Sequence, residues 1–261
     1  MNVLNMEFDT PYNSAPFSNI KITDFLPAFK TSLAESKKNI AAIVSNPEPP
    51  NFKNTVEALE FSSLRLDRIS SLFFNLNAAE TSDAIQKIAQ EVSPLLTSHS
   101  NDIALNKSLF DRLKIVYNRL ENLNLTTEQK TLLEKKYKGF VRNGANLNPN
   151  DKTRLRKIDK ELSVSKLTFG EHLLAETNKF RLEINKTCDL EGLPENLIAA
   201  AKLLGEKEEK KGWVFTLDYP SYVSFMTHAK NRTLRKKMAI SFGKKGFQKD
   251  SLDNQELLLK I

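Results

Sequence analysis

Residues 148–180, NPNDKTRLRKIDKELSVSKLTFGEHLLAETNKF, are the stretch that decides the fold class of this chain. Asn148 suits the cap of a helix, and Pro149 suits the first helical position because its missing N–H would be unpaired there in any case. The side chains that follow repeat about every 3.5 residues, the spacing of one helix face, at Leu155, Ile158, Leu162, Ser165, Phe169, Leu173 and Phe180. The pattern predicts a helix of about eight turns, far longer than the usual ~11–12 residues and suited to the spine or wall of a large molecule.

Five shorter helices are predicted before this segment, each starting near a residue that can cap a first turn. The proposed starts are Thr23, Asn54, Ser82, Asn106 and Thr126, the last forming a capping box with Gln129. Proline and glycine place the other boundaries. Pro47 should end the first helix, Pro94 should kink or break the third, and Gly144 suits a left-handed turn after the fifth.

The pattern changes after the long helix. RLEI at 181–184 and WVFTL at 213–217 are short strand-like runs on either side of a helix predicted at 194–204. Further helices are predicted at 221–229, at 233–242 and from Asp253. We therefore predict an all-α protein with a minor β element around 181–217.

Two regions are expected along the chain. Residues 1–147 should form an N-terminal helical domain. Residues 148–261 should contain the long helix, the short strands and the start of a further helical region. The last helix reaches Ile261 without a glycine or proline stop signal, so we expect the chain to be cut inside an element.

Composition places the chain among soluble globular proteins, with 40% hydrophobic and 27% charged residues. No apolar run approaches the ~18 residues needed to cross a bilayer, and the first residues do not resemble a signal peptide. The expected location is the cytoplasm. The net charge of +7 is uneven: residues 130–166 carry a net +7 and residues 230–249 a net +8. These two basic clusters could attract an acidic partner, although nucleic acid is an unlikely one, or they could be solvated helix faces.

Residues for hydrolytic chemistry are scarce. The three histidines, His99, His172 and His228, have no second histidine three to five residues away, and no HExxH motif occurs. Glu171 and His172 are not followed one turn later by the second histidine that zinc binding from one helix face requires. We therefore predict no catalytic, cofactor-binding or metal-binding residue in this segment.

Cys188 is the only cysteine and could in principle act as a nucleophile with a distant histidine. The neighbouring carboxylate of Asp189 opposes the thiolate form, which counts against that hypothesis.

Several segments resemble, in order and spacing, the N-terminal half of the thimet oligopeptidase, neurolysin and peptidyl-dipeptidase family of zinc metallopeptidases. The most specific are NPEPPNFKNT at 46–55 and FVRNGANL at 140–147. The other matching segments lie at 8–20, 27–29, 40–82, 99–113, 190–194, 218–238 and 253–258.

The resemblance implies a mainly helical enzyme of two lobes, with a deep channel that admits short peptides. It also implies zinc held by an HExxH helix and a later glutamate, none of which this chain contains. We therefore expect a non-catalytic N-terminal fragment that forms a wall of the channel, with short peptides and its own missing C-terminal catalytic region as partners. Two alternatives stay open: a helical binding module that uses its basic faces for an acidic partner or nucleic acid, and an independent enzyme that uses Cys188 or a histidine.

Overall fold

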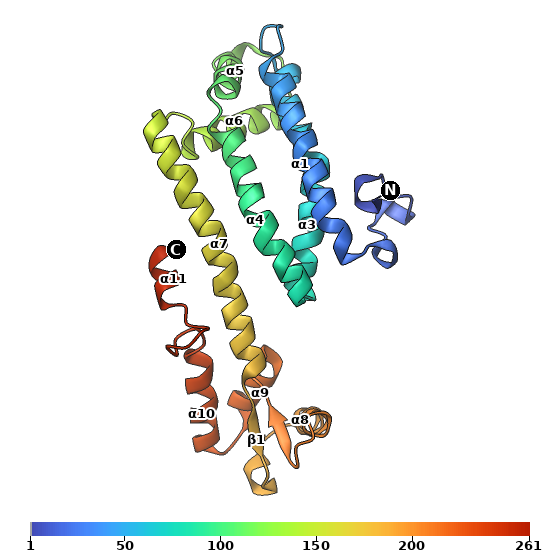
Figure 1. Cartoon of the computed structure of the whole chain (residues 1–261), viewed down its shortest axis with the longest axis vertical. Coiled ribbons are helices and arrows are strands. Elements are labelled where there is room, and N and C mark those ends of the chain that lie inside the picture. Colours follow the sequence, from blue (N-terminus) through green and yellow to red (C-terminus); the bar gives the residue numbers. More distant parts are fainter. Residues whose placement is uncertain (1) are drawn as a thin grey trace. The chain divides into compact units, whose positions relative to one another are not determined.

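The computed structural model describes residues 2–261 and separates the chain into two compact units (Figure 1). Unit 1 ends at Val164, and unit 2 is Ser165–Ile261. The structure is 72% helical with one two-stranded sheet, so the predicted all-α class is confirmed. The division after Val164 falls within one helix of the sequence, and the domain boundary predicted before Asn148 stays a prediction. No helix among the described residues is long and apolar enough to cross a membrane.

Unit 1 is built from six helices and the first half of a seventh. Their bounds are α1 Ile22–Val44, α2 Ala58–Glu60, α3 Leu64–Ala79, α4 Asp83–Ala104, α5 Lys107–Tyr117, α6 Thr127–Arg142 and α7 Pro149–Lys179. A π-helical segment, Phe52–Glu57, precedes α2. Helices α1, α3 and α4 lie side by side (Figure 1).

The core of unit 1 has two aromatic centres. Between α1 and α3, Phe73 packs edge-on against Phe25 and Phe29, with ring centroids 5.1 and 5.4 Å apart, and all three side chains are almost fully buried. Between α5 and α6, the Phe110 ring stacks on Phe140 and on Tyr137. Burial of such rings supplies most of the stabilisation available to an amphipathic helix pair.

Three of the predicted helix starts in unit 1 are confirmed. The side chains of Ser82, Asn106 and Thr126 accept hydrogen bonds from the first turns of α4, α5 and α6. Gln129 completes the predicted box by accepting from the Thr126 N–H at 3.0 Å. Gly144 has a φ of +90°, as its predicted role in a left-handed turn requires.

Two other predicted starts are wrong. The first helix begins at Ile22, one residue before Thr23, because the Asp24 carboxylate accepts the Lys21 N–H and fixes the turn earlier. The second begins after Asn51, whose side chain and backbone exchange hydrogen bonds with those of Asn54.

Two predictions about helix continuity also need correction. Pro94 does not break its helix, because α4 continues through it to Ala104. The second predicted helix is not continuous: the tighter turn Phe61–Ser63 separates α2 from α3.

Unit 2 starts in the second half of α7 and contains a small sheet. Strands β1 Leu182–Ile184 and β2 Trp213–Phe215 pair antiparallel, with Leu182 opposite Phe215. The helices are α8 Glu195–Lys207, α9 Tyr219–His228, α10 Arg232–Gly243 and α11 Gln255–Lys260. The strands, the long helix and the helices around 194–204, 221–229 and 233–242 were all expected from the sequence.

Helix α8 packs closely on the hairpin because glycine allows it. A Cβ placed on Gly205 would lie 2.4 Å from the Gly212 carbonyl oxygen, which is too close for any other residue. The core beneath contains Phe215 and Phe225, whose ring centroids are 4.9 Å apart. At the start of β2, the Lys202 ammonium lies 5.6 Å from the Trp213 ring centroid, a cation–π contact.

Candidate functional site

The histidines and the cysteine considered from the sequence occupy separate positions. His99 lies in α4 and is buried, His172 lies in α7 and is half-buried, and His228 ends α9 in an exposed position. Cys188 is exposed, in a short turn between β1 and α8. Within residues 2–261, no three His, Cys, Asp or Glu side chains are grouped so that they could hold a metal ion.

A chain of hydrogen bonds missed by the sequence analysis lies inside unit 1. Ser36 Oγ of α1 lies 2.8 Å from His99 Nε2 and 2.7 Å from Ser63 Oγ, just before α3. Burial lowers the pKa of His99, and Lys37 lowers it further, which favours a neutral imidazole. The Ser36–His99 pair therefore has the groups of a nucleophile and its general base.

Access and orientation argue against that chemistry. Ser36 and His99 are 1% and 4% exposed, so the hydroxyl could not meet a peptide bond without local opening. His99 Nδ1, where a triad carboxylate would bind, has no hydrogen-bond partner among the described residues. The pair is best described as a polar link between α1, α4 and the start of α3.

Two surface clefts adjoin this link. Ser36 lines a cleft of about 460 Å³ together with Glu35, Asn39 and Arg65. His99 lines a smaller one of about 320 Å³, whose walls are the α1 and α4 side chains Lys37, Ile40, Ala41, Val44, Asp102 and Ile103. The carboxylates that line them, Glu7 and Glu35 in the first and Asp102 in the second, each accept a hydrogen bond from an arginine and none is bonded to the Ser36–His99 pair. The clefts offer binding surface and no assembled catalytic group.

Unit 2 contains a second buried polar cluster around Asn254, which is 3% exposed. Asn254 Oδ1 lies 2.8 Å from His172 Nδ1, and its Nδ2 donates to the Phe169 carbonyl at 3.1 Å. The buried Glu176 carboxylate accepts the N–H of Gly246. These contacts attach the loop before α11 to α7, so the role of these polar side chains is structural.

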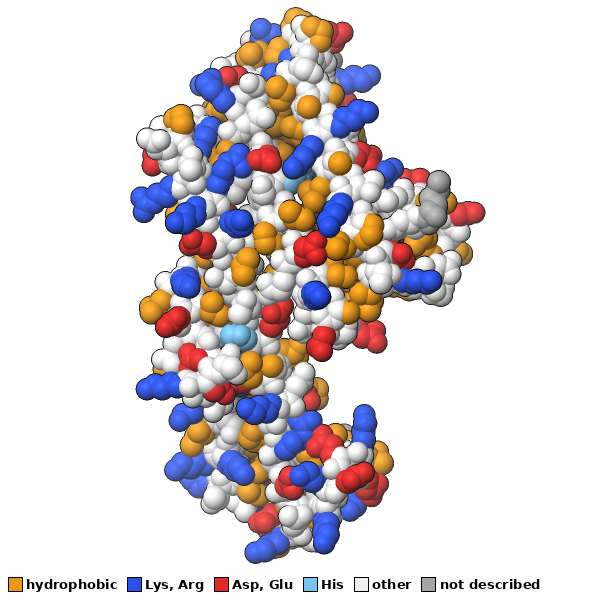
Figure 2. Space-filling view, viewed as in Figure 1, with side chains coloured by type: hydrophobic (Ala, Val, Ile, Leu, Met, Phe, Trp, Pro, Cys, Tyr) orange, Lys and Arg blue, Asp and Glu red, His pale blue; other side chains and the backbone are white. Residues whose placement is uncertain are grey.

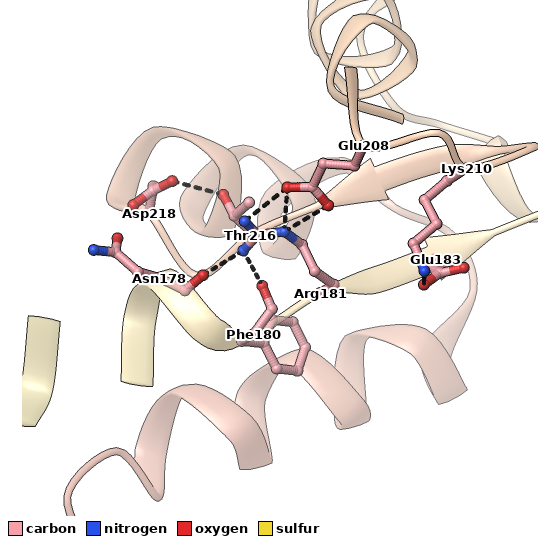
Figure 3. A network of polar contacts seen from close by, with 8 residues as sticks. All are labelled: Asn178, Phe180, Arg181, Glu183, Glu208, Lys210, Thr216 and Asp218. Carbon is pink, nitrogen blue, oxygen red and sulfur yellow. Dashed lines mark hydrogen bonds and ion pairs between the residues drawn. The ribbon is translucent and has the colours of Figure 1, made fainter. Parts of the chain in front are cut away.

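The end of α7 is fixed by Arg181 (Figure 3). Its guanidinium donates to the carbonyls of Asn178 and Phe180 and to both Glu208 oxygens, with Nε–O distances of 2.8 and 3.0 Å. The hydrogen bond with Glu208 raises the pKa of Arg181 and lowers the pKa of Glu208. A cation at the carbonyl end of a helix complements its dipole.

Two further pairs in Figure 3 lie beside the strands. Lys210 pairs with Glu183 of β1 at 2.9 Å, and the Thr216 hydroxyl donates to Asp218 at 2.9 Å. Together with Arg181 they form a structural network at the hairpin. Beside it is a cleft of about 460 Å³ between α8, β2 and the start of α9, lined mainly by apolar and small side chains.

The two basic clusters differ in how their charges are used. In the first cluster, Arg156 pairs with Asp102 at 2.7 Å, Lys138 pairs with Glu134 at 2.8 Å, and Lys136 pairs with Glu60. In the second, Lys230 pairs with Glu191 at 2.7 Å, and Arg235 donates to backbone carbonyls before α10. Most other cations of the second cluster point from α10 into solvent.

Comparison with known proteins gives the family context. No family model matches the chain. Its sequence is 32% identical to the dipeptidyl carboxypeptidase of Escherichia coli over 262 aligned positions, which cover 100% of this chain and 38% of that protein. It is 28% identical to oligopeptidase A of Salmonella typhimurium over 229 positions, covering 88% of this chain and 34% of that protein.

A relative in Arabidopsis thaliana, a probable cytosolic oligopeptidase A, is 26% identical over all of this chain and 37% of its own length. The chain thus spans little more than a third of the relatives it matches. Over its whole length, the chain matches the N-terminal third of proteins of the dipeptidyl carboxypeptidase and oligopeptidase A family.

Proposed function

We propose that this chain is the non-catalytic N-terminal part of a zinc-dependent peptidase that hydrolyses short peptides. The observation that carries the proposal is the match over the whole chain to the N-terminal third of proteins named as peptidases. In the longer protein, this part is proposed to form one wall of the substrate channel, with the catalytic groups supplied by the remaining sequence.

The residues of this chain do not fit the zinc site that the family implies. No HExxH motif occurs in the sequence, and no metal-binding group of three side chains is found within residues 2–261. A hydrolytic zinc needs three protein ligands and one open position. We therefore assign the zinc ligands to the part of the longer protein that lies outside this chain.

The arrangement of α7 supports a structural role. Of its 31 residues, only Ser165 and Glu176 are buried, while Ile158 and Leu174 are 42% and 37% exposed. A long helix with so much partly exposed apolar surface is suited to line or support a larger structure.

Peptide cleavage by the purified chain tests the first part of the proposal. The chain is incubated with peptides of about six residues, with and without added zinc, and the products are followed by mass spectrometry. No cleavage is expected from this chain, whereas the longer protein should release short products. Zinc-dependent cleavage by residues 1–261 alone would contradict the proposal.

Crosslinking tests the channel wall. A non-cleavable peptide with a photoreactive side chain is bound to the longer protein, irradiated and mapped by mass spectrometry. Crosslinks should fall within residues 2–261 as well as outside them, and should disappear when excess unlabelled peptide is present. Specific crosslinks found only outside this segment would remove the wall from the proposal while leaving the family assignment intact.

A further inference from the structure

The solvent-facing side of α10 combines strong positive charge with an apolar centre. Successive helical residues rotate by about 100°, so Arg232, Lys236, Lys237 and Lys244 fall within an arc of about 140°. Ile240 lies near the middle of that arc and is 47% exposed. The opposite side is the packed one, where Met238 is fully buried. We call these five residues, Arg232, Lys236, Lys237, Ile240 and Lys244, the α10 basic face.

None of the four cations is neutralised within the protein. Each is exposed, and no ion pair or side-chain hydrogen bond of the described residues involves them. Residues 230–249 contain no aspartate or glutamate at all. In Figure 2, Lys and Arg side chains gather over the part of the surface where Figure 1 places α10.

This charge placement is unfavourable for the isolated helix. Arg232 stands at the first position of α10, where the positive end of the helix dipole repels a cation. Arg232 and Lys236 are like charges four residues apart, a spacing that brings them close on the surface. Three other cations of this segment make structural contacts: Lys230 pairs with Glu191, Arg235 donates to backbone carbonyls, and Lys245 donates to Thr177 and lies over the Phe242 ring. A destabilising arrangement of charges that no contact within the protein offsets is expected at a binding surface.

We propose that the α10 basic face binds an acidic segment of another protein, with an apolar side chain of that segment covering Ile240. Charge complementarity selects a partner rich in Asp and Glu. An apolar centre within a charged rim is the arrangement of protein–protein contacts, whereas binding to a phosphate backbone needs the cations alone. Because four of the five residues are charged, the face resembles a reversible interface more than a permanent, largely apolar one.

The test measures binding of two synthetic probes to the full 261-residue chain by titration calorimetry. One probe is a 12-residue peptide with six Glu around a Leu-Leu pair, and the other is a single-stranded oligonucleotide of equal charge. The variants are K236Q/K237Q/K244Q, which removes three cations, and Ile240→Ser, which removes the apolar centre. K135Q/K157Q/K160Q removes three exposed cations of the other basic cluster and is the matched control.

The triple variant of the face should weaken peptide binding roughly tenfold. Each exposed charge changes the affinity about twofold, and the three effects multiply. Ile240→Ser should weaken peptide binding several-fold and leave oligonucleotide binding unchanged. The control should change peptide binding less than twofold. Binding should also weaken steeply as salt is raised.

Three outcomes would overturn the proposal: no binding of the peptide at low salt, equal losses in the face and control variants, or an unchanged peptide affinity in Ile240→Ser. Tighter binding of the oligonucleotide than of the peptide would assign the face to nucleic acid instead. Thermal unfolding separates binding from folding. Removing the three cations should not lower the unfolding temperature, because it relieves repulsion in α10.

Discussion

The two units differ in how completely their buried polar atoms are paired. Among the described residues, the buried side-chain nitrogen and oxygen atoms without a hydrogen-bond partner are found in Asn5, Arg68, His99 and Arg112, all in unit 1. In unit 2 the buried polar side chains of Asn254, Glu176 and Thr216 are each paired.

The size of the cores explains the difference. Unit 1 has a larger apolar core, with aromatic clusters on two helix pairs, and burial of apolar surface there can offset the cost of an unpaired polar atom. Unit 2 is smaller, at 97 residues, and buries a smaller fraction of its surface. Its loops are fixed by polar contacts instead. We infer that the stability of unit 1 comes mainly from apolar packing, whereas the stability of unit 2 depends more on its hydrogen bonds.

The largest expected effect is the loss of Phe73. Phe73→Ala should lower the unfolding free energy of unit 1 by about 3–5 kcal/mol, because it removes a buried ring and leaves a cavity between α1 and α3. Hydrogen exchange read by mass spectrometry should show faster exchange in α1 and α3 and unchanged protection in β1 and β2. Phe225→Ala should give the reverse pattern. Equal loss of protection in both units from either variant would mean that the chain unfolds as one.

The hydrogen bonds of unit 2 are tested at Asn254. Asn254→Ala should cost about 1–3 kcal/mol, since it removes a buried side chain together with its hydrogen bonds to His172 Nδ1 and to the Phe169 carbonyl. Faster exchange should follow in the loop before α11. Gln248→Ala, at an exposed position of the same loop, is the control and should change little. If the two variants were equal, the Asn254 cluster would not be what holds this loop.

The exposed cap of α6 should matter less. Thr126→Ala removes the side-chain acceptor for the Gln129 N–H and should cost about 1 kcal/mol in thermal unfolding. Thr127→Ala, one residue later, keeps the cap and should have a much smaller effect. A cost equal in the two variants would show that the capping box contributes nothing beyond helix propensity.

The smallest effect is a pH dependence of unit 1. The pKa of His99 is lowered by burial and by Lys37, with Asp102 and Asp67 acting in the opposite direction. The unfolded state therefore binds more protons than the folded state, and the unfolding free energy falls as pH drops below about 6.5. At pH 6 only part of the unfolded chains have gained a proton on His99, so the loss of unfolding free energy is small.

His99→Gln checks the assignment. Glutamine can still bond Ser36 but does not titrate, so the difference in unfolding temperature between pH 7.5 and pH 6 should shrink in this variant. His228→Gln, at an exposed position, should leave the difference unchanged. An unaltered pH dependence in His99→Gln would place the titrating group elsewhere.

Local signals predicted the elements of this fold better than its polar clusters. The caps at Ser82, Asn106 and Thr126 act within one turn, so a single stretch of sequence contains the whole interaction. The predicted starts at Thr23 and Asn54 were wrong for an equally local reason. The hydrogen bonds made by the side chains of Asp24 and Asn51 begin the two helices at earlier residues.

The polar clusters could not be predicted in this way. Ser36 and His99 are 63 residues apart, and His172 and Asn254 are 82 apart. Neither pair has a sequence spacing that would predict the contact. Each contact forms only because the packing of the chain brings distant residues together. The helical period does place Ser36 on the same face as Leu33 and Ile40, which is the one signal that could have drawn attention to a buried hydroxyl.

The position of Trp213 gives the chain a built-in optical reporter. It is the only tryptophan, and it lies in β2 next to Lys202, within unit 2. Its fluorescence emission should shift to longer wavelength when the hairpin opens and the indole meets water. Unit 1 contains tyrosine but no tryptophan. Unfolding of unit 1 alone should therefore change the circular dichroism of the chain while leaving the emission maximum in place, so two spectra from one unlabelled sample follow the two units separately.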